Sequence, residues 1–421
     1  MRIAILGGGI TGLTTAYYLN KKGYKVSVFE KENNLGGLAS GFKTSTWNWY
    51  LERTYHHLFS NDSDILNFAK EIGFNDIYFQ SPLTASLYKE INNYRIIPVD
   101  TPQDFLKIPY LNLVDKLRAG LTVVFLKLSP FLKVYEKNSA EVFLKKTMGE
   151  RVWDILWREL FRKKFGEYAG IILTSFIWAR IKKRTKSLGY IKGGFQELIN
   201  YLHKLLVGQQ VNVSTNFEVK EISKKGEKYL INNQLFDAVV STLPTPIMIR
   251  LTKNVFPEAY LKRISKIKYL SAVNLILETD KPLIDKTYWL NVCDKNIPIM
   301  CLVQHTNFIN KKNYGNKHLL YVANYVGDND KLLKMSKEEI LNFYAPYLKK
   351  ISPNYQPLTT SYYLFKAPFA QPIFDKEFIK NKPEFITPQK NFYIANLDMT
   401  YPYDRGTNFA VKLGKKVAEL V

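Results

Sequence analysis

The sequence predicts an α/β protein, because helices and strands occur together in three separate stretches of the chain. Residues 1–30 read as a strand, a glycine-rich turn, a helix and a second strand. Residues 189–244 read as a helix followed by three strands, and residues 391–420 as a strand, a loop and a helix. A chain of 421 residues suggests roughly two to three domains. The first stretch predicts that one of these domains is Rossmann-like.

The first stretch carries the glycines of a dinucleotide-binding turn. A short apolar strand runs into Gly7, Gly9 and Gly12, and the strand after the helix closes on Glu30. In this motif the first glycine permits a tight turn, the second lets the backbone approach a pyrophosphate, and the third lets helix and strand pack closely. The helix N-terminus attracts the phosphates. Because Glu30 is placed to accept hydrogen bonds from ribose hydroxyls, we expect a bound dinucleotide.

A second glycine pair, Gly36 and Gly37, follows the strand that ends on the acidic residue. A simple NAD domain needs no second backbone approach at this place. The arrangement resembles the FAD-dependent amine oxidase and protoporphyrinogen oxidase superfamily, in which this pair flanks the diphosphate, and it implies FAD as the cofactor. Members often carry a basic residue directly after the pair. Here Leu38 stands there, so the resemblance implies that a phosphate contact from this position is lost or supplied elsewhere.

The resemblance extends to the middle and the end of the chain. Residues 189–244 look like the family segment that returns to the cofactor domain, in which Val219 would contact adenine through its backbone. Residues 391–420 look like the closing strand, loop and helix, and a helix beginning near Thr407 would point its N-terminus at the flavin pyrimidine ring. The family's Gly-Asp or Gly-Glu dipeptide is replaced here by ANLD. Asp398 would then be the residue that reaches the ribityl chain.

On this resemblance the FAD-binding domain is discontinuous, and an α+β substrate domain is inserted into it. The FAD-binding domain would comprise residues 1–58, 187–250 and 385–421. The substrate domain would comprise a mainly helical part, 59–186, and a mainly β part, 251–384. Within these parts the sequence predicts helices at 64–74 and 149–166 and strands at 271–279, 297–305, 318–326 and 359–367. Substrate would enter between the two domains, over the flavin ring.

Two adjacent histidines, His56 and His57, lie in the run YLERTYHHLF. A metal site would need further ligands at workable spacing, and none is evident, so we expect no metal. In relatives an acid-x-Gly-x-His pattern at this distance from the second glycine pair runs past the flavin ring. Glu52, Thr54 and His56 occupy those places here, with threonine where glycine is usual. The resemblance makes His56 and Arg405 the candidate catalytic residues, while a plain packing role for the histidines stays open.

A basic cluster at residues 179–186 is suited to an anionic substrate or to acidic lipid head groups, although a solvated helix face is an alternative. Arg180 and Arg184 lie one helical turn apart and are the candidate substrate-binding residues. The apolar segment 108–135 is studded with Lys and Arg and is too short to span a membrane. We expect it to form a core helix pair bent at Pro130. A monotopic anchor in the membrane interface is the alternative.

The formal net charge is +23, which predicts an anionic partner unless it merely reflects a lysine-rich composition. No nucleic-acid-binding signature is present, so a nucleic acid is not the expected partner. Cys293 and Cys301 form neither a disulfide framework nor a zinc pattern, which fits a reducing cytoplasm. Peripheral contact with the inner face of a membrane is compatible with this location.

Together these features predict a cytoplasmic FAD-dependent oxidoreductase that transfers a hydride from a small organic substrate, anionic or isoprenoid, to the flavin. Residues 291–308 also look like the matching part of UDP-galactopyranose mutases. A redox-neutral mutase or isomerase acting on a nucleotide sugar or isoprenoid is therefore the alternative. A flavin-binding protein without turnover, serving as a membrane-associated assembly partner, is a third hypothesis.

Overall fold

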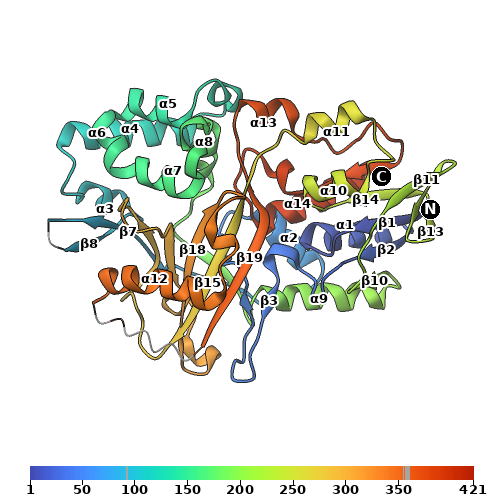
Figure 1. The fold of residues 1–421 in the computed structure, drawn as a ribbon, viewed down its shortest axis with the longest axis horizontal. Helices are drawn as coiled ribbons and strands as arrows, with labels where there is room; N and C mark the ends of the chain where they lie inside the picture. The colour runs from blue at the N-terminus through green and yellow to red at the C-terminus, as the bar shows by residue number, and fades with distance from the viewer. Residues whose placement is uncertain (92, 354, 356–360) are drawn as a thin grey trace.

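A five-stranded parallel sheet forms the part of the molecule that carries both chain termini (Figure 1). The structure is a computed structural model that describes residues 1–91, 93–353, 355 and 361–421. The strand order is β10-β2-β1-β14-β20, and every neighbouring pair is parallel. The strands are β1 (Arg2–Leu6), β2 (Lys25–Phe29), β10 (Asn212–Ser214), β14 (Ala238–Ser241) and β20 (Phe392–Ile394). Three distant stretches of chain build one sheet, which confirms the predicted Rossmann-like α/β fold.

Side chains of β1 alternate between two apolar cores, one on each face of the sheet, as the two-residue period of a strand requires. Ile3 and Ile5 belong to the core that contains α1, α9 and α14, whereas Ala4 and Leu6 belong to the core formed with a small antiparallel sheet, α10 and α11. The helices are α1 (Ile10–Lys21), α9 (Phe195–Gly208), α10 (Thr245–Leu251), α11 (Glu258–Ile264) and α14 (Thr407–Leu420). The small sheet consists of β11 (Ile222–Lys225), β12 (Lys228–Ile231) and β13 (Gln234–Phe236).

A seven-stranded mixed sheet forms the centre of the inserted part, with α12 (Lys337–Ile351) packed against two of its strands. In spatial order the strands are β19 (Ser361–Pro372), β15 (Tyr269–Thr279), β18 (His318–Val326), β17 (Cys301–Gln304), β16 (Thr287–Val292), β7 (Leu83–Lys89) and β8 (Tyr94–Pro98). The strands predicted at 271–279 and 318–326 are confirmed, and the one at 297–305 is shorter. The strand predicted at 359–367 starts at two residues outside the described ranges.

Helices dominate residues 59–186. The first of them packs against α14, and the others gather at the end of the molecule opposite the termini (Figure 1). The helices are α2 (Ser63–Glu71), α3 (Pro102–Leu106), α4 (Leu113–Leu128), α5 (Ala140–Met148), α6 (Glu150–Val152), α7 (Arg158–Phe165) and α8 (Thr174–Lys183). A π-helical turn, Trp153–Trp157, joins α6 to α7. The same region also contains β6 (Ile77–Gln80), β7 and β8, which the sequence analysis did not predict. The parallel partner of β7 is β16, about 200 residues away, so the pairing has no local sequence signal.

The apolar segment 108–135 is not the predicted core helix pair. A 16-residue helix, α4, ends at Leu128, and a 3-10 turn at Leu132–Glu136 follows. Only Ala119, Thr122 and Leu126 of α4 are buried. The prediction was wrong because an apolar composition does not say whether another part of the chain covers a helix. Among the described residues, no helix is both long and apolar enough to cross a membrane.

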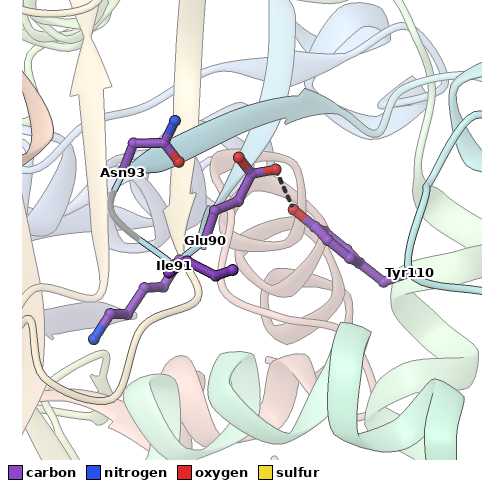
Figure 2. Close-up of a pocket in the computed structure, with 5 residues that line it drawn as sticks. Glu90, Ile91, Asn93 and Tyr110 are labelled. Carbon is purple, nitrogen blue, oxygen red and sulfur yellow. Dashed lines mark hydrogen bonds between the residues drawn. The ribbon is translucent and has the colours of Figure 1, made fainter.

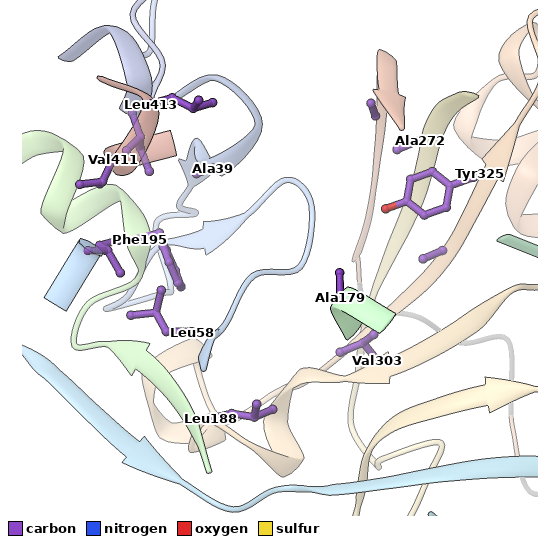
Figure 3. Close-up of a cluster of buried hydrophobic side chains, with 14 of the residues drawn as sticks. Ala39, Leu58, Ala179, Leu188, Phe195, Ala272, Val303, Tyr325, Val411 and Leu413 are labelled. Atoms are coloured by element: carbon purple, nitrogen blue, oxygen red, sulfur yellow. The ribbon is translucent and has the colours of Figure 1, made fainter. Parts of the chain in front are cut away.

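One apolar core continues from the part built on the five-stranded parallel sheet, the nucleotide-binding part predicted from the glycine turn, into the inserted part built on the seven-stranded sheet. Figure 3 shows members of this core from both, among them Phe195 and Val411 on one side and Ala179 and Tyr325 on the other. Short strands lie where the chain passes between the parts, namely β3 (Gly41–Phe42), β4 (Leu51–Glu52), β5 (Leu58–Phe59) and β9 (Leu188–Ile191). The division of the chain at residues 58, 187, 250 and 385 stays a prediction.

Candidate active site

The turn after β1 has the close packing that its glycines predicted. Gly7 has φ +102°, a conformation that side chains rarely adopt, and a β-carbon on Gly12 would lie 2.0 Å from the Gly7 carbonyl oxygen. Helix α1 starts directly after Gly9, its N-cap, which offers no side-chain hydrogen bond of its own. The first N–H groups of α1 are therefore available to an anionic ligand.

The two glycine motifs meet, backbone to backbone. Gly9 and Gly36 form a parallel bridge, and the Gly36 N–H donates to the Gly8 carbonyl at 2.9 Å. A β-carbon built on Gly9 would lie 3.9 Å from the Cα of Gly37. Leu38 is half-buried in the 3-10 turn that follows the pair. A ligand that lies over this junction would meet main-chain atoms from both motifs.

Glu30 directly follows β2 and points at the first glycine turn. One carboxylate oxygen accepts the Gly8 N–H at 2.8 Å, and the other accepts the Glu32 N–H at 2.9 Å. The loop after β10 crosses the same strand end, because the Phe217 N–H donates to the Glu30 carbonyl at 2.8 Å. Val219 lies two residues further along this loop and is half-buried. The loop that carries Val219 is therefore hydrogen-bonded to Glu30, while the contacts of these two residues to adenine and ribose stay predictions.

The closing helix starts at the predicted residue, since α14 begins at Thr407. The Thr407 hydroxyl is buried without a hydrogen-bond partner among the described residues. Upstream, Asp398 accepts hydrogen bonds from the Thr245 and Tyr269 hydroxyls, both at 2.6 Å, and its second oxygen is buried without a described partner. Burial raises the pKa of the Asp398 carboxyl to about 6. The Thr407 hydroxyl and the second Asp398 oxygen therefore each lack a described partner.

Asn396 is a residue that the sequence analysis missed. It lies only two residues after the end of β20, closer to the strand end than Asp398. Its side-chain amide donates to the Leu243 carbonyl at 3.0 Å and to the Thr245 hydroxyl at 2.9 Å. The signal was present in ANLD, where asparagine stands nearer to the strand than aspartate.

Arg53 is a second residue that the analysis missed. Its main-chain N–H donates to the Ser40 carbonyl at 3.1 Å, which places it beside the turn of the second glycine pair. Its Nε is buried and has no partner within the described ranges. The Arg53 guanidinium lies 5.6 Å from the centre of the Phe365 ring, and Leu38 leaves the turn without an adjacent basic side chain of its own.

The two histidines lie in the coil between β4 and β5, and their rings have different surroundings. The His56 Nδ1 lies 2.5 Å from the Thr54 carbonyl oxygen, whereas the His57 Nδ1 lies 3.3 Å from the Tyr288 hydroxyl. Burial lowers the pKa of His56 to about 4, and the Arg405 charge acts in the same direction. Thr54 does not have a positive φ, so the main chain does not require the glycine expected there.

Glu52 is fully buried and fully hydrogen-bonded. Its carboxylate accepts the Phe195 N–H at 2.7 Å and the Tyr190 hydroxyl at 2.8 Å. Burial raises the pKa of this carboxyl to about 7, although both hydrogen bonds act against the shift. Glu52 therefore anchors the start of α9 beside His56, whose ring lies 5.6 Å from that of Phe195.

A partly buried charge cluster centres on Asp404, whose side chain is 21% exposed, while that of Arg180 is 46% exposed. One of its oxygens accepts hydrogen bonds from the Lys164 Nζ at 2.7 Å and from Arg180 at 2.8 Å. Burial alone would raise the pKa of this carboxyl, but the charges of Lys164 and Arg180 outweigh it and hold the pKa well below its usual range. Arg405 follows directly, and its guanidinium lies 5.0 Å from the centre of the Tyr325 ring.

Arg180 and Arg184 reach different carboxylates although they lie one turn apart. Arg184, at the end of α8, donates to Asp100 at 2.9 Å. Burial lowers the pKa of His57 to about 3, and the charges of His56, Arg180 and Arg184 add to the shift. Both imidazoles are therefore neutral at pH 7. The structure gathers the four predicted residues, His56, Arg180, Arg184 and Arg405, around one region.

Two open hollows lie outside this region. One of about 470 Å³ is at the turn between β7 and β8, where the Tyr110 hydroxyl donates to Glu90 at 3.0 Å (Figure 2). The other, of about 550 Å³, lies beside the second glycine pair and is lined in part by Asn34, Lys43 and Asn200. Neither is lined by a predicted site residue.

No group of three or more potential metal-ligating side chains occurs in the described part of the chain.

Residues 10–421 match the family model of flavin-containing amine oxidoreductases. The chain belongs to this family. The family binds FAD, the cofactor expected from the second glycine pair. The chain is 22% identical over 316 residues to the 15-cis-phytoene desaturase of Glycine max. The matched region covers 67% of this chain and 54% of that protein. The chain thus spans about half the length of this relative.

Solved structures show the same fold over nearly the whole chain. An oxidoreductase from Methanosarcina mazei has a TM-score of 0.77 at 19% identity, covering 100% of both chains. A reduced UDP-galactopyranose mutase has a TM-score of 0.74 at 17% identity, covering 99% of this chain and 94% of that chain. At such identities these likenesses establish the fold alone.

The residues of this chain suit the family's cofactor. The glycine backbones, the free N–H groups of α1 and the buried Nε of Arg53 are donors that suit a diphosphate. At the far end, the unpaired Thr407 hydroxyl and the N-terminus of α14 suit the polar edge of an isoalloxazine.

Proposed function

We propose that this flavin-containing amine oxidoreductase transfers a hydride from a carbon atom of a small organic substrate to FAD. When bound, the cofactor supplies the electron-accepting chemistry. The main support is that the two glycine motifs meet at the carboxyl ends of the parallel strands. The N-terminus of α14 lies at the same end of the sheet. Binding sites of open α/β sheets lie at this carboxyl edge of the strands.

The proposed cofactor contacts follow the order of the cofactor's parts. Gly7, Gly9, Gly12, Gly36 and Gly37 form the diphosphate cradle, with Arg53 as the cation that Leu38 does not provide. Glu30 would accept the ribose hydroxyls and Val219 would contact adenine through its backbone. Asn396 and Asp398 would bind the ribityl chain, and Thr407 would bind the flavin ring.

The side chains at the ring would orient the substrate and exclude water, and none is arranged to remove a proton. His56 and His57 are neutral, and their Nδ1 atoms already lie against Thr54 and Tyr288. Glu52 is occupied by the Phe195 N–H and the Tyr190 hydroxyl. We assign His56 and Arg405 to substrate positioning beside the ring. Hydride transfer to flavin needs no indispensable general base from the chain.

The substrate would be anionic. Lys164, Arg180 and Arg405 surround the single carboxylate of Asp404, and Arg184 lies nearby on Asp100. The positive charges exceed the negative ones, and a phosphate or carboxylate group of a substrate, including an isoprenoid phosphate, would balance them. Arg180 and Arg405 are the side chains that we expect to contact this group.

A redox-neutral mutase or isomerase is the second candidate, favoured by the same surplus of cations, which also suits a nucleotide sugar diphosphate. Anaerobic mixing separates the two. An oxidoreductase bleaches the flavin absorbance when substrate is added, whereas a mutase turns over only after pre-reduction and consumes no reductant. Candidate substrates should be screened as matched pairs with and without their anionic group, because only the anionic member should react.

We further propose a cytoplasmic location with contact at the inner face of a membrane. The net charge of +23 and the two free cysteines support this location.

A further inference from the structure

The helix α4 is apolar on two opposite sides. Its buried side chains, Ala119, Thr122 and Leu126, form one stripe that packs against α5 and α8. A second apolar stripe on the opposite side is exposed to solvent. It consists of Val114, Leu117, Leu121, Val124 and Leu128, whose spacing of three and four residues keeps them on one face. Phe125 and Leu113 flank the stripe and are exposed as well.

The exposed side chains are large and strongly solvated. Leu121 is 70% exposed and Leu128 is 74% exposed, and Phe131 and Val134, just beyond the end of the helix, are exposed as well. An exposed apolar surface of this extent usually marks a contact with another molecule or a membrane. We call the exposed side chains of residues 113–134 the α4 face.

Most charged residues in the stretch 105–135, which carries the α4 face, are positive. Asp115 is the only acidic residue between positions 105 and 135, and it is held by Asn112 and Arg151. The basic residues in the same stretch are Lys107, Lys116, Arg118, Lys127 and Lys133. Two copies of such a face would repel each other in a symmetric dimer. An anionic bilayer offers both an apolar interior and complementary charge.

We propose that the α4 face is a membrane-docking surface that lies in the interface of an anionic bilayer. Helix α4 has 16 residues, about 24 Å in length, which suits a helix lying in the plane of the interface. Figure 1 shows α4 at the end of the molecule away from both termini, so that docking leaves the nucleotide-binding part in water.

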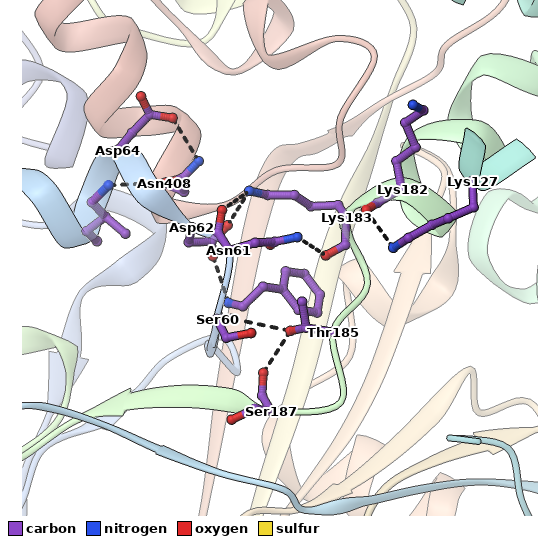
Figure 4. Close-up of polar contacts among 12 residues, drawn as sticks. Ser60, Asn61, Asp62, Asp64, Lys127, Lys182, Lys183, Thr185, Ser187 and Asn408 are labelled. Atoms are coloured by element: carbon purple, nitrogen blue, oxygen red, sulfur yellow. Dashed lines mark hydrogen bonds and ion pairs between the residues drawn. The ribbon is translucent and has the colours of Figure 1, made fainter. Parts of the chain in front are cut away.

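The docked helix is firmly connected to the proposed substrate site. Lys127 donates to the carbonyls of Ile181 and Lys182 in the last turn of α8, the helix that carries Arg180. Lys183, also in that turn, pairs with Asp62 at 2.9 Å (Figure 4). The inference deepens the proposed function, because a substrate with an apolar part would enter from the bilayer toward Arg180.

The test is vesicle co-sedimentation of the full-length, FAD-loaded protein. Vesicles of phosphatidylcholine alone are compared with vesicles of phosphatidylcholine and phosphatidylglycerol, and FAD per chain is measured in the same samples. We expect strong binding to the mixed vesicles and weak binding to the neutral ones. Failure to bind either kind, with FAD retained, would overturn the docking proposal and the proposed membrane contact, and would leave the proposed hydride transfer to FAD untouched.

Two sets of variants locate the surface. The triple variant Leu121→Gln, Phe125→Gln, Leu128→Gln should weaken binding by about tenfold or more. The control Val207→Gln, Ile386→Gln, Leu420→Gln removes exposed apolar side chains from the nucleotide-binding part and should bind like wild type. Equal losses in both sets would overturn the assignment.

The charge contribution is tested with Lys107→Gln and Lys133→Gln against the exposed controls Lys225→Gln and Lys253→Gln. Lys107→Gln and Lys133→Gln should each weaken binding to mixed vesicles about fivefold, and the controls should have little effect. Sedimentation velocity without lipid measures whether the protein forms a dimer. A dimer that the apolar triple variant dissociates, together with absent vesicle binding, would show that a second copy covers the face and would refute the proposal.

Discussion

Gly9 and Gly37 face each other across the two glycine turns, and a β-carbon added to Gly37 would lie 3.4 Å from the Cα of Gly9. Gly9→Val should therefore abolish FAD retention, because its methyl groups would occupy the space of the diphosphate. We expect at least about a tenfold loss of FAD affinity, measured by titration and by flavin absorbance per chain. Gly327→Val is the matched control, since a β-carbon there meets no described atom within 4 Å. Wild-type retention in Gly9→Val would refute the placement of the diphosphate.

Glu52 should give the folding stability a distinct pH dependence. The folded state keeps this carboxyl protonated up to a pKa of about 7, whereas the unfolded chain releases the proton near 4.5. Stability should fall as pH rises between these values, by up to about 3 kcal/mol. Glu52→Gln should lack this slope in urea unfolding series from pH 4.5 to 8, with wild type measured in parallel. Parallel profiles for the two proteins would contradict burial of a protonated Glu52.

Asp404 should be the stabilising counter-charge of the cation cluster. Asp404→Asn leaves the partly buried ammonium of Lys164, whose pKa is already lowered to about 8 mainly by burial, without its carboxylate. We expect a loss of roughly 3 kcal/mol in the free energy of unfolding. The control Glu227→Gln removes a solvent-exposed pair with Lys390 and should cost less than about 1 kcal/mol. Similar losses in the two variants would show that the cluster is no stronger than a surface pair.

The packing of α1 against α14 depends on Gly414. A β-carbon there would lie 2.7 Å from the Thr11 carbonyl oxygen and 2.8 Å from the Thr14 Cβ. Gly414→Ala should destabilise the fold by about 1–3 kcal/mol. Gly120 lies inside helix α4, and a β-carbon added there would meet no described atom within 4 Å. Gly120→Ala should therefore raise the free energy of unfolding by about 1 kcal/mol. Urea unfolding of both variants checks the contrast, and a stabilising Gly414→Ala would contradict the packing.

Local sequence patterns predicted the nucleotide-binding part well. The glycine spacing and Glu30 specify a turn and a strand end that adjoin in the chain, and the parallel sheet confirms that arrangement. The family resemblance of residues 391–420 also predicted a helix that begins near Thr407, and α14 begins there. These signals are short-range, so no distant part of the chain can alter them.

Long-range contacts escaped prediction. Lys164 and Asp404 are 240 residues apart, and no local sequence pattern around either residue suggested that they pair. The pairing of β7 with β16 and the exposure of α4 are of the same kind. In each case the outcome depends on which distant residues the folded chain brings together, or, for α4, on none of the described residues covering the helix. Local residue order does not contain this information.

The central claim is that this chain holds FAD at the junction of Gly9 and Gly37. The most direct measurement is the absorbance spectrum of the purified protein, followed by denaturation and chromatographic identification of the released cofactor. We predict a yellow protein that releases about one FAD per chain. A colourless protein that does not take up added FAD would contradict the claim.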